Sequence, residues 1–260
     1  AGSVASNFAL VTVNPARIQA VVGEALTWTL PADPNVSSYS VTRLPPGLLF
    51  DANAGTITGT PHRAGVWVVQ IKGVNGVSIV RSAQLPIQVA PLNAGLVGRF
   101  NGLVAKSAEL NDNLGSRIDC VVSSSGVASG RLISSKGSAA FIGSLKTTLS
   151  NPTEATLSVP VSLFGSGQNL QLDLLFDASS QRISGEVVLK SSVANPQSAA
   201  VAVVFGWGNS WGRFRAAGYA GDYRFHMMPD SSPADSPQGY GYGSAFVSRE
   251  TGGVSLWGSL

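Results

Sequence analysis

Short runs of aliphatic and β-branched residues, separated by turns rich in glycine, proline, serine and asparagine, recur along the whole chain. Leu170–Leu174 alternates apolar and polar side chains, which is typical of a strand with one buried face. Asp177–Arg182 then provides a turn, and Ile183–Val187 returns as a second strand. Charged residues make up only 12% of the chain, although surface helices are rich in Glu and Lys. The pattern therefore predicts an all-β protein built from antiparallel strands.

The 260 residues are enough for two domains, each with its own core. From Phe8 to Val89, β-rich runs and turns alternate at the spacing of a small antiparallel sandwich. Pro91–Gly95 interrupts this pattern, and we place the domain boundary there. We expect an Ig-like antiparallel sandwich over residues 1–91 and a larger antiparallel β-barrel-like meander of roughly ten strands over residues 95–260.

Three spaced elements of the first domain carry a family resemblance. In Leu44–Asp51, two prolines fix φ and Gly47 permits a tight turn. Asp51–Gly55 predicts a turn whose carboxylate accepts backbone amides, and Gly59–Pro61 follows as a corner. In this order, the elements resemble the Ig-like, or cadherin-like, module of bacterial surface proteins over residues 5–90. The resemblance implies an extracellular or cell-surface location, that is, a secreted protein with several domains.

The second domain contains a weak internal repeat, because Gly98 precedes Val122 by 24 positions and Gly221 precedes Val247 by 26. We expect the last strand, Ser255–Ser259, to pair with the domain's first strand at residues 96–104. Such pairing would close a barrel and remove both unpaired edges. Two alternatives are a natural protein that continues past this chain and a neighbouring subunit that supplies the partner strand.

Residues 200–260 also resemble a β-rich repeat of large surface proteins from Verrucomicrobia and related bacteria. The resemblance rests on a Trp-x-x-x-Trp segment, a Gly-x-Tyr strand, a glycine-rich loop and a hairpin: Trp207–Trp211, Tyr219–Tyr223, Pro237–Gly243 and Val247–Ser248. It implies modularity and a surface location, and it assigns no catalytic residue.

Side chains suited to catalysis or metal binding are few and scattered. The two histidines lie far apart in the chain, and His62 is expected in a solvated loop. Asp222 and His226 are four residues apart on a predicted strand, about 13 Å, which is too far for a hydrogen bond. The single cysteine, Cys120, lies in a strand-like run and is expected to be a buried hydrophobe. No metal-ligand spacing occurs, so we expect no metal. Because the side chains suited to catalysis are scattered, we also expect no enzyme activity and no cofactor.

Aromatic residues crowd the C-terminal part of the chain. Tyr240, Tyr242, Trp207 and Trp211 combine flat rings with polar neighbours, as in many sugar-binding β-proteins. Tyr240 and Tyr242 would face the same way if their loop is extended. The alternative is that these rings fill a glycine-rich barrel core.

The sequence as a whole predicts a non-catalytic structural or adhesion module of a bacterial surface protein, which works with neighbouring domains or subunits. A carbohydrate-binding, lectin-like module that binds glycans is the alternative, and a self-assembling surface polymer subunit is the third possibility. The net charge is only +3 and is spread along the chain, which indicates no nucleic-acid partner. No apolar run approaches the ~20 residues of a membrane-spanning helix, so we expect no transmembrane segment.

Overall fold

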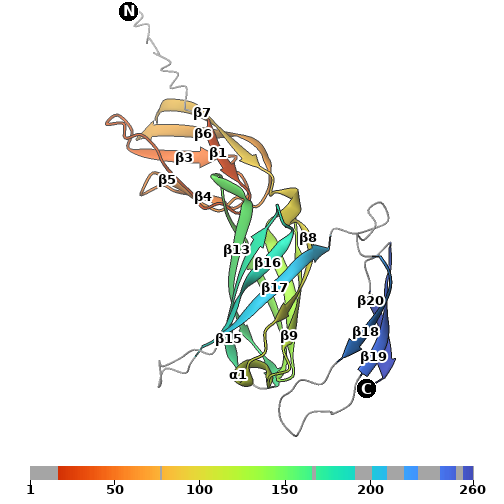
Figure 1. Cartoon of the computed structure of the whole chain (residues 1–260). Helices are drawn as coiled ribbons and strands as arrows, with labels where there is room; N and C mark the ends of the chain where they lie inside the picture. The colour runs from red at the N-terminus through yellow and green to blue at the C-terminus, as the bar shows by residue number, and fades with distance from the viewer. Residues whose placement is uncertain are drawn as a thin grey trace, which may run out of the picture. The chain divides into compact units, whose positions relative to one another are not determined.

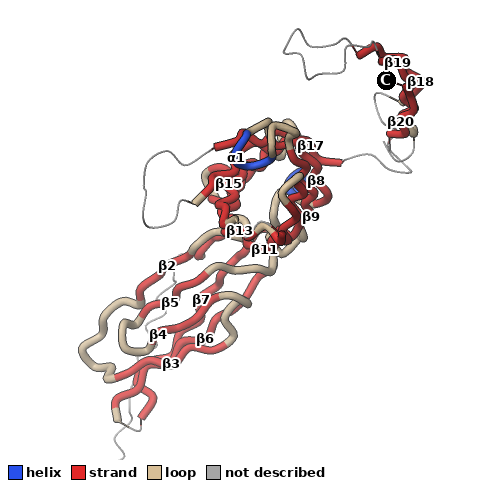
Figure 2. Tube along the Cα trace, turned by 90° about the horizontal axis from the view of Figure 1, so that it is seen from below, coloured by secondary structure: helices blue, strands red, loops and turns tan. Residues whose placement is uncertain are grey.

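A computed structural model describes residues 17–76, 78–165, 168–190, 201–209, 220–227, 241–249 and 254–259. These residues are almost entirely strands, and helix is confined to short turns (Figures 1 and 2). The predicted all-β class, an Ig-like sandwich followed by a barrel-like antiparallel meander, is confirmed. The chain divides into two compact units, residues 1–208 and 209–260. The domain boundary predicted at residues 91–95 stays a prediction.

The Ig-like sandwich consists of two packed sheets. Its strands are β1 (Ile18–Val21), β2 (Leu26–Thr29), β3 (Ser38–Thr42), β4 (Leu48–Asp51), β5 (Thr56–Gly59), β6 (Gly65–Asn75) and β7 (Ser78–Ala90). One sheet has the order β1-β7-β6-β3, with β1 parallel to β7, and the other has the order β2-β5-β4. Ile57, Val69 and Leu85 are completely buried between the sheets, so the apolar face of each strand forms the core.

The predicted turns of the sandwich have the expected geometry. Gly47 has a φ of +96°, and a Cβ there would overlap the carbonyl oxygen of Thr60. The Asp51 carboxylate accepts hydrogen bonds from the backbone amides of Asn53 (2.8 Å) and Ala54 (3.1 Å), and Gly55 completes the turn with a φ of +64°. The Leu-Pro-Pro-Gly segment and the Asp turn therefore specify the two connections that position β4.

The barrel-like sheet follows the sandwich. Its elements are η1 (Ala94–Leu96), β8 (Gly98–Val104), α1 (Ala108–Asn111), β9 (Ser116–Val122), β10 (Val127–Ser134), β11 (Gly137–Ser144), β12 (Lys146–Thr148), β13 (Asn151–Ser162), β14 (Phe164–Gly165), β15 (Asn169–Asp177), β16 (Arg182–Leu189) and β17 (Val201–Asn209). The sheet has the order β12-β13-β15-β16-β17-β8-β9-β10-β11-β14.

This sheet is a nearly closed barrel. A single residue, Leu145, separates β11 from β12, and Leu163 separates β13 from β14. β12, which continues from β11, pairs with β13, and β14, which continues from β13, pairs with β11. The two ends of the sheet therefore meet at these short strands.

One edge of β8 pairs with β9, and β17 pairs with the other edge, as the hydrogen bond from Ala105 N to Val203 O (2.8 Å) shows (Figure 1). The prediction that Ser255–Ser259 closes the barrel on residues 96–104 is therefore wrong. An antiparallel meander of this curvature returns to its first strand after about eight long strands, before the C-terminal strands are reached.

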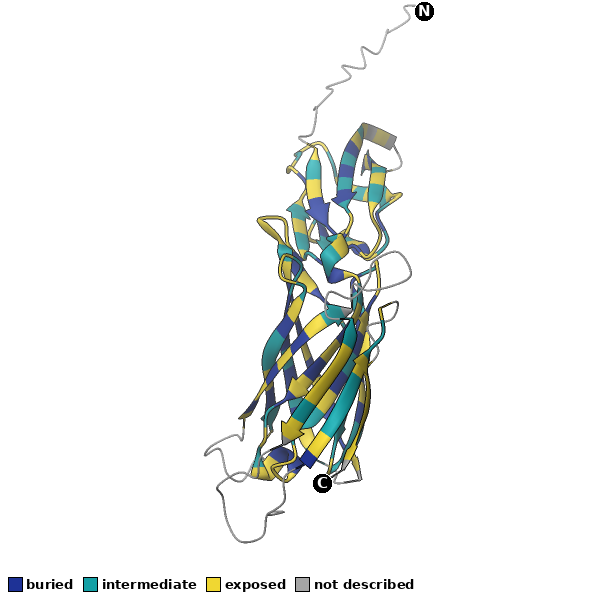
Figure 3. Ribbon diagram, turned by 45° about the vertical axis from the view of Figure 1, so that its right-hand side comes forward, coloured by how far each residue is buried: buried dark blue, intermediate teal, exposed yellow. Residues whose placement is uncertain are grey.

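Side chains, rather than a lumen, fill the barrel. Residues alternate between buried and exposed along the barrel strands (Figure 3), and Phe100 meets Phe176 edge-to-face at 5.1 Å in the core. The buried side chain of Asn111 in α1 forms hydrogen bonds with backbone groups at one end of the barrel. Its Oδ1 accepts from Ser107 N (2.8 Å) and Gly115 N (3.2 Å), and its Nδ2 donates to Ala105 O (2.8 Å). The barrel is a packed core closed by a short helical cap.

The second unit contains a three-stranded sheet with the order β18 (Gly221–Met227), β19 (Gly241–Val247) and β20 (Val254–Ser259). Gly221 pairs with Val247, as Gly98 pairs with Val122 in the barrel. The sheet thus reproduces the pairing of β8 and β9. Within the described residues, β20 pairs only with β19.

Candidate functional site

Two of the four aromatic residues predicted to bind sugars are described, and both are exposed. Trp207 on β17 is 54% exposed and Tyr242 on β19 is 66% exposed. Tyr240 and Trp211 lie outside the described residues. Neither Trp207 nor Tyr242 fills the barrel core, and their role in carbohydrate binding stays a prediction.

Trp207 lies on the outer surface of the barrel with a cation beside it. Its cross-strand partner on β16 is Arg182, whose guanidinium carbon lies 5.9 Å from the centre of the indole. Phe205, two residues earlier on β17, meets the indole edge-to-face at 6.3 Å. These contacts orient the indole and leave half of its surface open to solvent.

A set of polar side chains from β8, β9 and β10 lines one depression on the outside of the barrel, here termed the arginine face: Arg99, Asn101, Arg117, Asp119 and Arg131. Asn101 pairs with Asp119, and Asp119 with Arg131, so these three lie in one row across three strands. Arg117 Nε lies 3.1 Å from Asp119 Oδ2. One carboxylate and three guanidinium groups therefore line the same depression.

Trp207 extends this row by one strand. The Ala105–Val203 hydrogen bond fixes the register of β17 against β8. Gly206 lies against the backbone of Asn101 and Gly102, since a Cβ on Gly206 would overlap the Asn101 carbonyl oxygen. The next residue, Trp207, is thus opposite Asn101 on the outer surface. The glycine brings β17 close enough to join the indole to the arginine face.

A third candidate is the contact between the sandwich and the barrel, here termed the junction. It joins the turn after β1 to the short strand β12. Thr147, one of the few buried polar residues in the described part of the chain, donates its hydroxyl to Val22 O (2.8 Å). Thr147 N donates to Gly23 O (3.3 Å), and Leu149 N donates to the Glu24 carboxylate (3.0 Å). The sandwich and the barrel are thus joined by backbone and side-chain hydrogen bonds.

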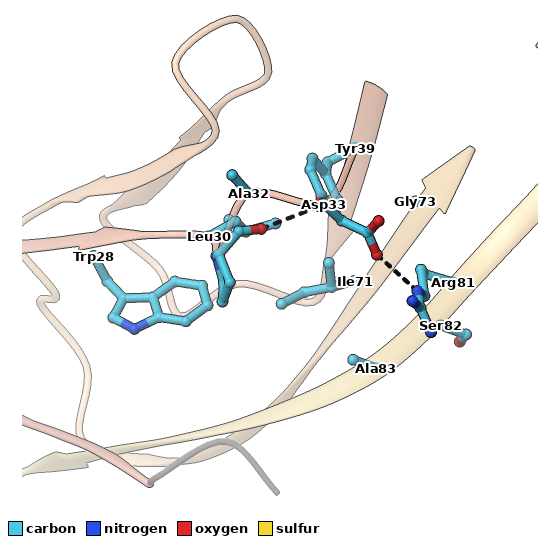
Figure 4. A pocket seen from close by; sticks show the side chains of 11 residues that line it. Trp28, Leu30, Ala32, Asp33, Tyr39, Ile71, Gly73, Arg81, Ser82 and Ala83 are labelled. Atoms are coloured by element: carbon cyan, nitrogen blue, oxygen red, sulfur yellow. Dashed lines mark hydrogen bonds and ion pairs between the residues drawn. The ribbon is translucent and has the colours of Figure 1, made fainter. Parts of the chain in front are cut away.

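The sandwich also contains a cavity of about 280 Å³ between its two sheets (Figure 4). Trp28, Leu30 and Ile71 provide most of its apolar lining, and Tyr39 donates its hydroxyl to Pro31 O (3.2 Å). Pockets for drug-sized ligands measure about 300–1,000 Å³. The cavity therefore falls just short of that range, and we interpret it as loose packing at the end of the sandwich.

An ion pair lies at the edge of this cavity. Arg81 Nε lies 2.7 Å from Asp33 Oδ2, and the amide of Asn35 donates to the same carboxylate (2.9 Å). The Asn35 amide and the Arg81 guanidinium hold the pKa of the Asp33 carboxyl below its ordinary value. The pair connects the loop before β3 to β7, so it contributes to the fold of the sandwich.

The residues considered for catalysis do not converge in the described structure. His62 is exposed in a loop, as predicted, and Asp222 and His226 are exposed on β18. Cys120 is buried, and burial raises the pKa of its thiol to about 12. Within the described residues, no group of His, Cys, Asp and Glu side chains could hold a metal ion. No helix in that part of the chain is long and apolar enough to cross a membrane.

Sequence reasoning missed the arginine face and the junction. The three arginines are on different strands, so only the register of those strands brings them together. Alternation does place each of them outside, because apolar neighbours such as Phe100, Ile118 and Leu132 point inward. The junction had no comparable signal, since Val22 and Thr147 are 125 residues apart.

The comparisons with known proteins identify the first part of the chain. Residues 9–89 match the family model described as "Putative Ig domain". This match confirms the predicted Ig-like module, and modules of this family are generally non-catalytic. The resemblance of residues 200–260 to bacterial surface repeats is not confirmed. No curated protein matches the chain.

Proposed function

We propose that the Ig-like sandwich and the barrel act together as one rigid arm of a bacterial extracellular or cell-surface protein. The task of this arm is spacing or adhesion, without catalysis. The Ig-like family of residues 9–89 supports a non-catalytic structural module. The packed barrel core supports a mechanical role, because its interior is occupied by apolar side chains.

The junction carries this proposal. A flexible linker would let the sandwich and the barrel move independently. Here the Thr147 hydroxyl satisfies the buried carbonyl of Val22, and the Glu24 carboxylate accepts amides from Val21 (3.2 Å) and Leu149 (3.0 Å). Rotation about the junction would break these bonds and leave a buried acceptor unpaired, at a cost of about 1–3 kcal/mol for that group alone.

Gly23 makes this close contact possible. It has a φ of +89°, and a Cβ at this position would lie 2.8 Å from the carbonyl oxygen of Leu145 and 3.1 Å from the Thr147 hydroxyl. Only glycine combines this backbone conformation with so close an approach to a neighbouring chain segment. The turn after β1 is therefore shaped to fit against β12.

The tumbling of the two parts in solution tests the rigid arm. In ¹⁵N relaxation measurements on the full chain, sandwich and barrel amides should share one rotational correlation time. The double variant Glu24→Ala/Thr147→Val should separate the two values. Glu154→Ala/Thr156→Val makes the same chemical changes on the exposed side of β13 and should leave them equal. Separate correlation times in the unaltered chain would refute the proposal.

A second candidate function, assembly of copies into a surface polymer, is favoured by the C-terminal sheet. In the described residues, β20 has one edge without a partner strand, and Leu256 on this strand is 67% exposed. Such edges pair readily with another chain. Light scattering over a range of protein concentrations should show growing assemblies, and Leu256→Lys should reduce them. A monomer at all concentrations would exclude this function.

A further inference from the structure

We propose that the arginine face, extended by Trp207, binds an acidic glycan, a chain of sugars that carries carboxylate or sulfate groups. This inference goes beyond the rigid-arm function and does not depend on it. The guanidinium groups of Arg99 and Arg131 would contact the anionic groups, and the Trp207 indole would stack on a sugar ring.

The size of the surface fits an extended oligosaccharide. Trp207, Asn101, Asp119 and Arg131 lie in register on the neighbouring strands β17, β8, β9 and β10. Three interstrand spacings of about 4.8 Å give a row about 14 Å long. Arg99 and Arg117 flank the row on opposite sides, because β8 and β9 are antiparallel. A chain lying along the row would meet positive charge on both sides and at both ends, because Arg131 ends the row on β10 and Arg182 lies beside Trp207 at the other end.

The charge of this surface is unusual for so sparsely charged a chain. Only 17 of 260 residues are Lys or Arg, yet three arginines line this single depression. Within the described residues, Arg117 forms an ion pair with Asp119, whereas Arg99 and Arg131 are exposed and form none. Two guanidinium groups are therefore free to bind anions, and each can hold a carboxylate or sulfate through two parallel hydrogen bonds.

The polar residues in the middle of the row favour a glycan over other polyanions. Asn101 and Asp119 can hydrogen-bond to hydroxyl groups, which sugars present between their anionic groups. One face of the Trp207 indole lies near Arg182, and the side chain remains 54% exposed. The surface thus offers anion, hydroxyl and ring contacts together.

Calorimetric titration of the full chain with defined hexamers tests the inference. The probe is hexagalacturonate, and its fully methyl-esterified form is the control with the same rings and no charge. We expect hexagalacturonate to bind and the ester to bind at least tenfold more weakly. Added salt should weaken the binding of hexagalacturonate, because the arginine face is exposed to solvent.

Three variants locate the binding site. Arg99→Gln/Arg131→Gln removes the two unpaired guanidinium groups and should weaken hexagalacturonate binding about tenfold, while Trp207→Ala should also weaken it. Arg63→Gln/Lys72→Gln removes the same charge from exposed positions of the sandwich and should leave the affinity unchanged. Each variant should retain the melting temperature of the unaltered chain, because the altered side chains are exposed.

Several results would overturn the inference. The first is no binding of hexagalacturonate at millimolar concentration, and the second is equal affinity for the methyl ester. The third is a loss of affinity in Arg63→Gln/Lys72→Gln as large as that in Arg99→Gln/Arg131→Gln. A Tyr242→Ala variant that abolishes binding, with Trp207→Ala unchanged, would place the site on the C-terminal sheet instead. Equal affinity for a single-stranded DNA hexamer would show a general polyanion surface rather than a glycan site.

Discussion

At the scale of single residues, two glycines of the Ig-like sandwich adopt left-handed conformations with different surroundings. A Cβ on Gly47 would overlap the Thr60 carbonyl oxygen, whereas a Cβ on Gly55 would meet nothing within 4 Å. We predict that Gly47→Ala lowers the free energy of unfolding by about 2–4 kcal/mol, and Gly55→Ala by about 1 kcal/mol. Urea denaturation measures both. Equal effects would show that steric overlap contributes nothing at Gly47.

Cys120 gives a second prediction at this scale. Burial raises the pKa of its thiol from the ordinary value of 9.0 to about 12, so the folded state favours the neutral thiol. The stabilisation is complete below pH 9 and is lost as the pH rises towards 12. We expect the free energy of unfolding to fall over this range, and Cys120→Ala to remove that part of the pH dependence. At pH 8, a thiol reagent should react only after urea unfolding, and rapid labelling of the folded chain would contradict the assignment.

At the scale of elements, glycines let neighbouring barrel strands approach closely. A Cβ on Gly130 of β10 would overlap the Asp119 carbonyl oxygen of β9, and Gly185 and Gly206 meet their neighbouring strands in the same way. We predict that Gly130→Ala costs about 1–3 kcal/mol of unfolding free energy through overpacking. Ser129→Ala, on the exposed side of the same strand, should change stability by less than about 0.5 kcal/mol. Thermal melts of the two variants provide the comparison.

The local pattern of elements could be predicted from the sequence, and their long-range pairing could not. Alternation correctly placed the hairpin at residues 170–187, because each strand shows its buried face in its own residues. Closure depends on how many strands fit around the barrel, which no single strand records. The sequence therefore predicted the meander but assigned its closing strand to Ser255–Ser259 instead of β17.

The candidate sites follow the same division. Trp207 could be selected from the sequence as a candidate sugar-binding residue, since it belongs to a cluster of aromatic residues with polar neighbours, whereas its exposure is seen only in the structure. Its neighbours Asn101 and Arg182 could not, because they come from β8 and β16, and only the barrel register brings them beside the indole. Thus single residues of a site can be read from the sequence, but their grouping requires the fold.

At the scale of the whole molecule, the junction should couple the folding of the sandwich and the barrel. Gly23→Ala introduces strain at a φ of +89° and a contact with the Leu145 carbonyl oxygen. We predict that the unaltered sandwich and barrel unfold in one transition, and that Gly23→Ala separates their midpoints. Hydrogen exchange resolved by residue in increasing urea would follow both parts. Two transitions in the unaltered chain would show that the junction couples the unfolding of the sandwich and the barrel only weakly.

The most direct test of the rigid arm is the distribution of distances between the sandwich and the barrel. Spin labels can be attached at two exposed positions, Leu49→Cys on β4 and Ile142→Cys on β11, in a Cys120→Ala background. Pulsed electron paramagnetic resonance then measures the distance between the two labels. The rigid arm predicts a single narrow distance distribution that broadens in Glu24→Ala/Thr147→Val. A broad distribution in the chain with its junction intact would contradict it.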